Sequence, residues 1–178
     1  MKIAVIGTHS TGKTTLCYDI AALLKRKSKS VSIVAEVSRE AIKKGLPINQ
    51  KTTLLAQGWI LFTQIAKEIE AENEAEIIVC DRSVVDNYIY MLNKFGKQEF
   101  YETLILDWLV KSPYDLLIRI PPIYEIKDDN LRATELDFQM EIDEKLTEFL
   151  KEKNIEYIEL NDEDKTFWLK FILKKLNL

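Results

Sequence analysis

The residues best able to do chemistry in this sequence lie close to its N-terminus. Gly7, Gly12, Lys13 and Thr14 form the pattern G-x-x-x-x-G-K-[ST], directly after a short apolar run. Glycine lets the backbone approach a phosphate closely, and successive backbone N–H groups at a helix start then surround the anion. The pattern predicts a phosphate-binding loop over Gly7–Thr14.

Each position of this loop has an expected task in binding ATP and Mg²⁺. Lys13 is expected to reach the β- and γ-phosphates, and the Thr14 hydroxyl to bind the metal. Thr15 adds a second hydroxyl, while His9 either contacts phosphate or substrate or simply fills the loop. The predicted nucleotide-binding residues are Gly7, Thr8, His9, Ser10, Thr11, Gly12, Lys13, Thr14 and Thr15.

A second group of candidate residues follows the apolar run that ends at Cys80. Asp81 is suited to binding Mg²⁺ together with Thr14, because an acidic residue at a strand end commonly completes such a site. Arg82 carries a planar, permanent positive charge that suits a phosphoryl group in transfer. The alternative is a salt bridge that only closes the strand end.

The elements that must position these residues are apolar strands that alternate with helices. Strands are predicted over 3–6, 31–35, 76–80, 114–120 and 155–160. Helices are predicted over 13–26, 37–44, 52–72, 84–93, 98–111 and 134–153, with a last helix ending near 175. Buried strands of this kind indicate a parallel sheet covered on both faces. We expect an α/β fold, a three-layer α/β/α sandwich with five parallel strands, whose carboxyl ends bind the ligand.

Length and composition narrow the class of protein. The 178 residues suit a single domain over 1–178. The net charge of −4 argues against a dedicated nucleic-acid binder. No apolar run approaches the roughly 18 residues of a membrane span, and no signal peptide precedes the first strand, so a cytoplasmic protein is expected.

Two reactive residue types are too scarce for common metal or nucleophile chemistry. Cys17 and Cys80 are the only cysteines and both lie in apolar segments, so they are expected to be small core residues. His9 is the only histidine. A zinc site and a histidine-based catalytic triad are therefore excluded.

The sequence also lacks the signals of a GTPase. Guanine recognition needs N-K-x-D, and the nearest match, the segment 93–96, reads Asn-Lys-Phe-Gly. No D-x-x-G follows the third predicted strand. We therefore expect ATP rather than GTP as the nucleotide.

The sequence resembles the P-loop nucleoside and nucleotide kinases. The matching pieces are Gly7–Thr14, the triplet 81–83 (Asp-Arg-Ser) and the loop 128–132, and the order of elements agrees along nearly the whole chain. The segment 36–40 and the loop 128–132 look most like the branch that contains ribosylnicotinamide kinase domains. The resemblance implies ATP- and Mg²⁺-dependent phosphoryl transfer to the hydroxyl or phosphate of a small nucleoside or nucleotide.

The resemblance also assigns roles around the acceptor. In this family the acidic residue after the second strand binds the acceptor hydroxyl and can act as a base. The matching residue here is Glu36, and Asp81 is the competing candidate for the base. The alternative is that Glu36 is only an exposed acidic residue at the end of a strand. Arg82 would contact the acceptor or the transferred phosphate. Arg39 either holds an anionic substrate group or lies on the surface.

A lid-like loop is expected over 121–132. Kinases of this type close an arginine-bearing loop over ATP, and the candidate cation is Arg132, with Lys127 and Arg119 as further candidates. Related lids usually carry several arginines, whereas this loop has one, so a plain surface loop is the alternative. The predicted catalytic residues are Lys13, Glu36, Asp81, Arg82 and Arg132.

The acceptor pocket is expected between the ends of the second and third strands. Four aromatic residues come from bordering helices, and each either stacks on a base or belongs to the core: Trp59, Phe62, Tyr88 and Tyr90. A regulatory ATPase without a small-molecule acceptor is the alternative function. The oligomeric state is open, with a homodimer as one outcome.

Overall fold

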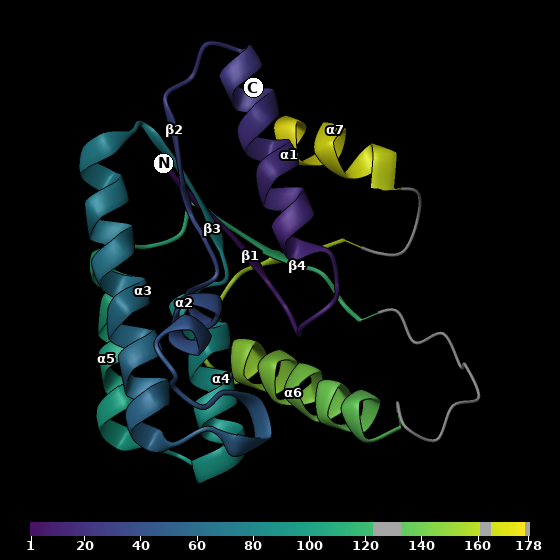
Figure 1. Ribbon diagram of the computed structural model, residues 1–178. Helices are drawn as coiled ribbons and strands as arrows, with labels where there is room; N and C mark the ends of the chain where they lie inside the picture. The colour runs from purple at the N-terminus through teal and green to yellow at the C-terminus, as the bar shows by residue number, and fades with distance from the viewer. Residues whose placement is uncertain (123–132, 161–164, 177–178) are drawn as a thin grey trace.

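The computed structural model describes residues 1–122, 133–160 and 165–176 (Figure 1). Arg132 and Lys127 lie outside the described residues, as does the predicted lid-like loop except for Pro121 and Pro122. The described residues form a five-stranded sheet with helices on both faces, which confirms the predicted α/β/α sandwich.

All the strand pairs are parallel, and the sheet order is β2-β3-β1-β4-β5. The strands are β1 (Lys2–Ile6), β2 (Val31–Val34), β3 (Ile77–Asp81), β4 (Leu116–Arg119) and β5 (Ile158–Glu159). Val5 lies opposite Asp81, so the end of β1 and the end of β3 are level. Residues that follow β1, β2 and β3 therefore gather at one edge of the sheet.

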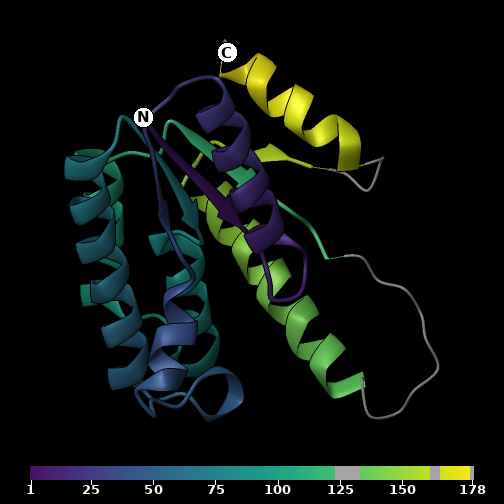
Figure 2. The same cartoon turned by 45° about the horizontal axis from the view of Figure 1, so that its top comes forward.

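The helices form two layers of unequal size. One face carries α1 (Lys13–Arg26) and α7 (Lys165–Lys175), and the other carries α3 (Leu54–Glu74), α4 (Val84–Phe95), α5 (Glu99–Lys111) and α6 (Ala133–Glu152) (Figures 1 and 2). The short α2 (Val37–Lys43) and the 3₁₀ turn η1 (Asn49–Lys51) follow β2 near its carboxyl end.

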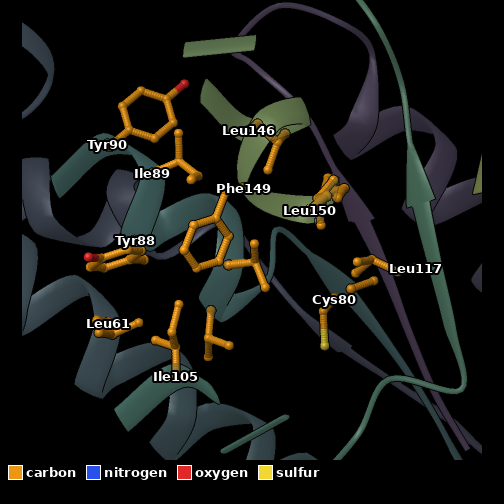
Figure 3. Packing of buried hydrophobic residues seen from close by; sticks show 14 of the residues in the cluster. Leu61, Cys80, Tyr88, Ile89, Tyr90, Ile105, Leu117, Leu146, Phe149 and Leu150 are labelled. Atoms are coloured by element: carbon orange, nitrogen blue, oxygen red, sulfur yellow. The ribbon is translucent and has the colours of Figure 1, made fainter. Parts of the chain in front are cut away.

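Alternate side chains of β1 point to opposite faces of the sheet and so belong to two separate parts of the core. Ile3 and Val5 pack with α1 and α7, whereas Ala4 and Ile6 pack with the larger layer. Figure 3 shows that larger cluster, in which the tilted rings of Tyr88 and Phe149 pack with centroids 5.6 Å apart. Successive side chains point to opposite faces of a strand, so a run that is apolar throughout belongs to a sheet covered on both sides.

Both cysteines are buried and unbridged, as expected for small core residues. Burial is the main cause that raises the thiol pKa of Cys17 and of Cys80, so neither is a ready nucleophile. No described helix has the length and hydropathy needed to span a membrane.

Two strands are shorter in the structure than the sequence predicts. The predicted 114–120 strand spans only Leu116–Arg119. Asp115, just before it, still contacts β1, because its N–H donates to the Lys2 carbonyl at 2.8 Å and its Oδ2 accepts from Lys2 N at 2.6 Å. The predicted 155–160 strand is reduced to Ile158–Glu159 at the sheet edge.

Candidate active site

The phosphate-binding loop, Gly7–Thr14, connects β1 to α1 at the carboxyl edge of the sheet. Gly7 and Gly12 have φ values of +136° and +89°, which side chains disfavour. A Cβ at Gly7 would also lie 2.5 Å from the Ile120 carbonyl oxygen. The first glycine therefore fits the loop against the end of β4, while Gly12 shapes the start of α1.

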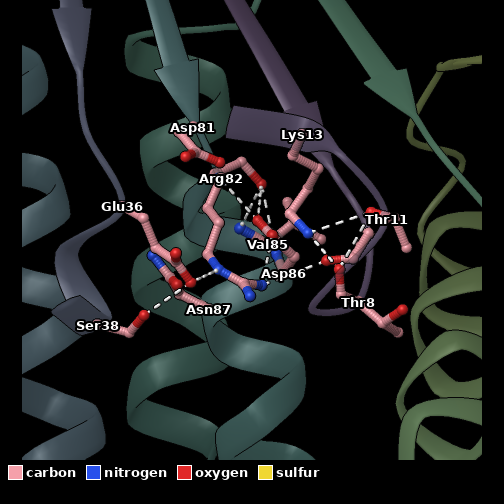
Figure 4. A network of polar contacts seen from close by, with 12 residues as sticks. Thr8, Thr11, Lys13, Glu36, Ser38, Asp81, Arg82, Val85, Asp86 and Asn87 are labelled. Carbon is pink, nitrogen blue, oxygen red and sulfur yellow. Dashed lines mark hydrogen bonds and ion pairs between the residues drawn. The ribbon is translucent and has the colours of Figure 1, made fainter. Parts of the chain in front are cut away.

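Lys13 is turned inward over this loop (Figure 4). Its Nζ donates to the Thr8 carbonyl and, at 3.3 Å, to Thr11 Oγ1, and the residue is only 5% exposed. Burial, aided by the charge of Arg82, lowers the pKa of Lys13 to about 8, against the opposing effect of Asp86 and Asp81. A bound phosphate would return the electrostatic stabilisation that burial removes, so this ammonium is placed to bind an anion.

The remaining loop residues differ in burial, and His9 is half-buried. Thr8 and Thr11 are buried, and Thr8 Oγ1 has no hydrogen-bond partner among the described residues. Ser10 and Thr15 are exposed on the loop and at the first turn of α1. His9 stacks on Phe138 of α6 with ring centroids 6.3 Å apart.

Thr14 and Asp81, the predicted metal ligands, meet directly. Thr14 Oγ1 donates to Asp81 Oδ2 at 2.6 Å, and Asp81 is 3% exposed. Asp81 Oδ1 is buried with no partner in the described residues, so it has a lone pair available for a cation. Mg²⁺ is typically held by one or two protein oxygens together with phosphates and water. These two side chains fit that donor set and would hold the ion.

Arg82 joins the phosphate-binding loop to the region after β2. Its Nε donates to Glu36 Oε1 at 3.0 Å, and Nη1 donates to the Gly7 carbonyl at 3.2 Å. Nη1 also lies 3.3 Å from Asp86 Oδ2, and the guanidinium carbon is 5.0 Å from the centre of the Tyr90 ring. Arg82 adopts φ +89°, a conformation that costs a non-glycine residue roughly 1–3 kcal/mol. Such strain is typical of functional sites.

Glu36 lies at the N-terminal end of α2 and collects three donors. Ser38 Oγ and Arg82 Nε bind one carboxylate oxygen, and Arg39 Nε binds the other at 2.9 Å. Burial by itself raises the pKa of Glu36, but Arg82 and the hydrogen bonds from Arg39 and Ser38 outweigh it and lower that pKa to about 2. Glu36 is thus ionised at neutral pH and suited to orienting a hydroxyl, while its basicity is weak.

Asp86 is a site residue that sequence reasoning missed. Ser83 caps α4 by accepting from the backbone N–H of Val85 and Asp86, and Asp86 Oδ1 accepts from Ser83 N in return. Burial is the main cause that raises the pKa of Asp86, against the opposing charge of Arg82. The signal was available in the sequence, because Ser-x-x-Asp over 83–86 is a capping-box pattern.

A pocket of about 300 Å³ lies between the ends of β2 and β3, beside Glu36 and Arg82. Its lining is His9, Glu36, Ser38, Arg39, Ile42, Ile48, Asn49, Gln57, Ile60, Arg82, Asn87 and Tyr90. Gln57 and Asn87 are buried amides that the sequence analysis did not single out. The apolar part of the lining comes from Ile42, Ile48, Ile60 and Tyr90, and the other lining residues are polar or charged. A concave pocket with polar groups beside apolar surface suits a small molecule.

Of the four aromatic candidates, the structure places Tyr90 in the lining of this pocket. Tyr88 is buried in the core and its hydroxyl donates to Glu102 at 3.0 Å. Phe62 is exposed beside Tyr101, and Trp59 packs on the small cluster under α2. Tyr90 is thus the aromatic candidate best placed to contact a ligand in this pocket.

Arg119, a further candidate for the lid cation, is bound by two carboxylates instead. It pairs with Glu159 and, at 2.6 Å, with Asp143 Oδ2 of α6, and it is 5% exposed. These contacts tie α6 to the end of β4. Arg39, by contrast, has a side chain that is 66% exposed at the pocket rim.

Comparison with known proteins assigns the chain to a family. Residues 2–166 match a family model described as AAA domain. The chain belongs to the AAA domain family. No curated protein is significantly similar to it in sequence.

Solved structures with the same fold include two complexes of NadR protein and a thymidylate kinase. NadR protein in complex with NR is 20% identical, with a TM-score of 0.77 over 99% of this chain and 51% of its own. NadR protein in complex with NAD and AMP-PNP is 18% identical, with a TM-score of 0.74 over 99% of this chain and 49% of its own. The chain therefore spans about half the length of these NadR chains.

Thymidylate kinase from Ehrlichia chaffeensis matches nearly end to end. It is 15% identical, with a TM-score of 0.67 over 100% of this chain and 98% of its own. The family match and these folds confirm the resemblance to the P-loop nucleoside and nucleotide kinases.

Proposed function

We propose that this protein is a kinase that transfers the γ-phosphoryl group of Mg-ATP to the hydroxyl or phosphate of a small nucleoside or nucleotide. The observation that carries this proposal is the position of Arg82. One guanidinium touches both the phosphate-binding loop, through Gly7, and the rim of the acceptor pocket, through Glu36. A protein that only binds and hydrolyses ATP has no need of the second contact or of the pocket beside it.

The proposed step has a simple balance. An acceptor oxygen attacks the γ-phosphorus, and the bond from that phosphorus to the β–γ bridging oxygen breaks. The products are ADP and the phosphorylated acceptor, and a hydroxyl acceptor also releases its proton. The protein contributes chiefly position and charge in such transfers. Lys13 and Arg82 would neutralise the phosphoryl oxygens, and Thr14 and Asp81 would hold Mg²⁺, which would supply further positive charge to the phosphates.

Glu36 is proposed to orient the acceptor rather than to act as a strong base. Its low pKa of about 2 makes it a poor proton acceptor, but an ionised carboxylate at the pocket rim is a good hydrogen-bond partner for a hydroxyl. The neighbouring fold relatives support a nucleoside- or nucleotide-like acceptor, since their structures are named for NR, for NAD with AMP-PNP, and for thymidylate kinase.

The test is ADP formation from Mg-ATP with and without a panel of nucleosides and nucleoside monophosphates. We expect at least one acceptor to stimulate turnover, and Glu36→Gln to lower that stimulated rate by about 100-fold while ATP affinity changes little. Glu40→Gln is the matched control, because Glu40 lies one turn further along α2 and pairs with Lys67 and Lys44. A regulatory ATPase would show no stimulation by any acceptor and no effect of Glu36→Gln on hydrolysis.

A further inference from the structure

The backbone around Arg82 needs support that the strand alone does not supply. Arg82 N donates to the Val5 carbonyl at 3.1 Å, which continues the pairing of β3 with β1 for one more residue. The chain then turns at φ +89° into α4. Two peptide groups form this turn. The first carries the Arg82 carbonyl and the second carries the Val84 N–H, and the direction of the Arg82 side chain depends on how both are held.

A fully buried carboxylate lies behind this turn. Glu68 of α3 is 0% exposed, and its two oxygens receive different donors. Oε1 accepts from Gln64 Nε2 at 2.9 Å and from Tyr114 Oη at 2.6 Å. Oε2 accepts from Lys2 Nζ at 3.0 Å and from Trp108 Nε1 at 3.2 Å. A buried charge is tolerated when it is saturated in this way.

The two donors on Oε1 also bind the Arg82 turn. Gln64 Nε2 donates to the Arg82 carbonyl at 3.3 Å, and Tyr114 Oη accepts from Val84 N at 3.0 Å. Burial is the main cause that raises the pKa of Tyr114 well above its usual value, so the phenol stays protonated and keeps its bond to Glu68. Lys2 and Trp108 donate to Glu68 Oε2, and among the described residues neither has a hydrogen bond to the Arg82 turn.

We propose that Gln64, Glu68 and Tyr114 form a positioning network that holds the Arg82 turn in its left-handed conformation and thereby aims the guanidinium at Glu36 and Gly7. This inference rests on the proposed function, in which Arg82 acts on the transferred phosphoryl group. Without the two bonds to the turn, Arg82 can relax to a negative φ, and its side chain leaves both partners.

The chain offers a matched pair of variants for the test. Tyr114→Phe and Trp108→Phe each remove one donor to Glu68 and keep an aromatic ring beside Lys2, whose Nζ lies 4.6 Å and 5.3 Å from the two ring centres. Only Tyr114→Phe also removes a bond to the turn. We expect Tyr114→Phe to lower kcat by about tenfold or more at unchanged ATP affinity, and Trp108→Phe to stay within about twofold. Thermal unfolding of both variants separates this effect from a general loss of stability.

A second measurement is independent of turnover. In ¹⁵N NMR spectra the Arg82 Nε–H resonance, assigned by its loss in Arg82→Lys, should be protected from solvent exchange because it donates to Glu36. We expect Tyr114→Phe and Gln64→Met to remove that protection and Trp108→Phe to retain it. An unchanged Arg82 signal in Tyr114→Phe and Gln64→Met would overturn the positioning network. Absence of any acceptor phosphorylation by the wild type, with the NMR result as expected, would overturn only the kinase.

Discussion

At the scale of single residues, nucleotide binding depends most on the ammonium group of Lys13. Its buried position and its contacts with Thr8 and Thr11 place positive charge inside the phosphate-binding loop. We expect Lys13→Ala to lower ATP turnover by about two orders of magnitude or more, since fixed charges contribute that much to stabilising transferred phosphoryl groups. Steady-state kinetics measures turnover, calorimetry measures ATP affinity, and circular dichroism shows whether the variant is folded.

Lys25→Ala is the control for that change, because Lys25 is an exposed lysine near the other end of α1. It should leave turnover and ATP affinity as they are. A folded Lys13→Ala protein with near-normal turnover would rule out the assignment of this lysine to the phosphates.

The ion pair of Glu36 with Arg82 makes a specific prediction about acid stability. The pKa of Glu36 falls from its ordinary 4.5 to about 2 on folding, so its contribution is full above pH 4.5 and is lost as the pH falls towards 2. Wild type should exceed Glu36→Gln in free energy of unfolding by about 1–3 kcal/mol at pH 6, and the gap should close between pH 4.5 and 2. Urea denaturation at a series of pH values gives this difference, and a gap that does not change with pH would contradict the ion pair.

At the scale of elements, α3 and α4 both begin with a hydroxyl cap, and only one of the caps touches the site. Thr53 Oγ1 accepts from Ala56 N at 3.2 Å, while Ser83 caps α4 next to Arg82. Ser83→Ala and Thr53→Ala should each destabilise the fold by roughly 1–2 kcal/mol. Ser83→Ala should also lower acceptor-stimulated turnover, since it loosens the turn that carries Arg82, whereas Thr53→Ala should not.

Urea denaturation and kinetics of the two alanine variants, measured side by side, distinguish these effects. Equal losses of activity at equal losses of stability would show that the Ser83 cap has no particular connection to the site.

The elements themselves were largely predictable, because continuous apolar strands and amphipathic helices leave clear patterns in the sequence. The polar residues inside the core were not. Gln57, Gln64 and Glu68 occupy buried positions of α3, and helical spacing showed them only as polar interruptions. Their partners, Thr52 for Gln57 and Lys2, Trp108 and Tyr114 for Glu68, are fixed by tertiary packing.

At the scale of the whole molecule, the sheet order explains how three short motifs form one site. With β1 between β3 and β4, and β2 beyond β3, the phosphate-binding loop, the Asp81–Arg82 strand end and Glu36 share one edge of the sheet. The sequence predicted a parallel sheet and its ligand-binding edge, but similar apolar strands do not specify which pairs with which. The contact of Thr14 with Asp81, 67 residues apart, and that of Arg82 with Glu36, 46 residues apart, follow from that order.

The central claim is that one site on this chain moves a phosphoryl group from ATP to a small acceptor. The most direct measurement is ³¹P NMR of the chain with Mg-ATP and a mixture of nucleosides and nucleoside monophosphates. We predict a new phosphomonoester or phosphoanhydride resonance that grows in step with ADP, and its absence in Arg82→Lys, where the planar guanidinium is lost. Growth of ADP and inorganic phosphate alone, with every acceptor unchanged, would contradict the claim.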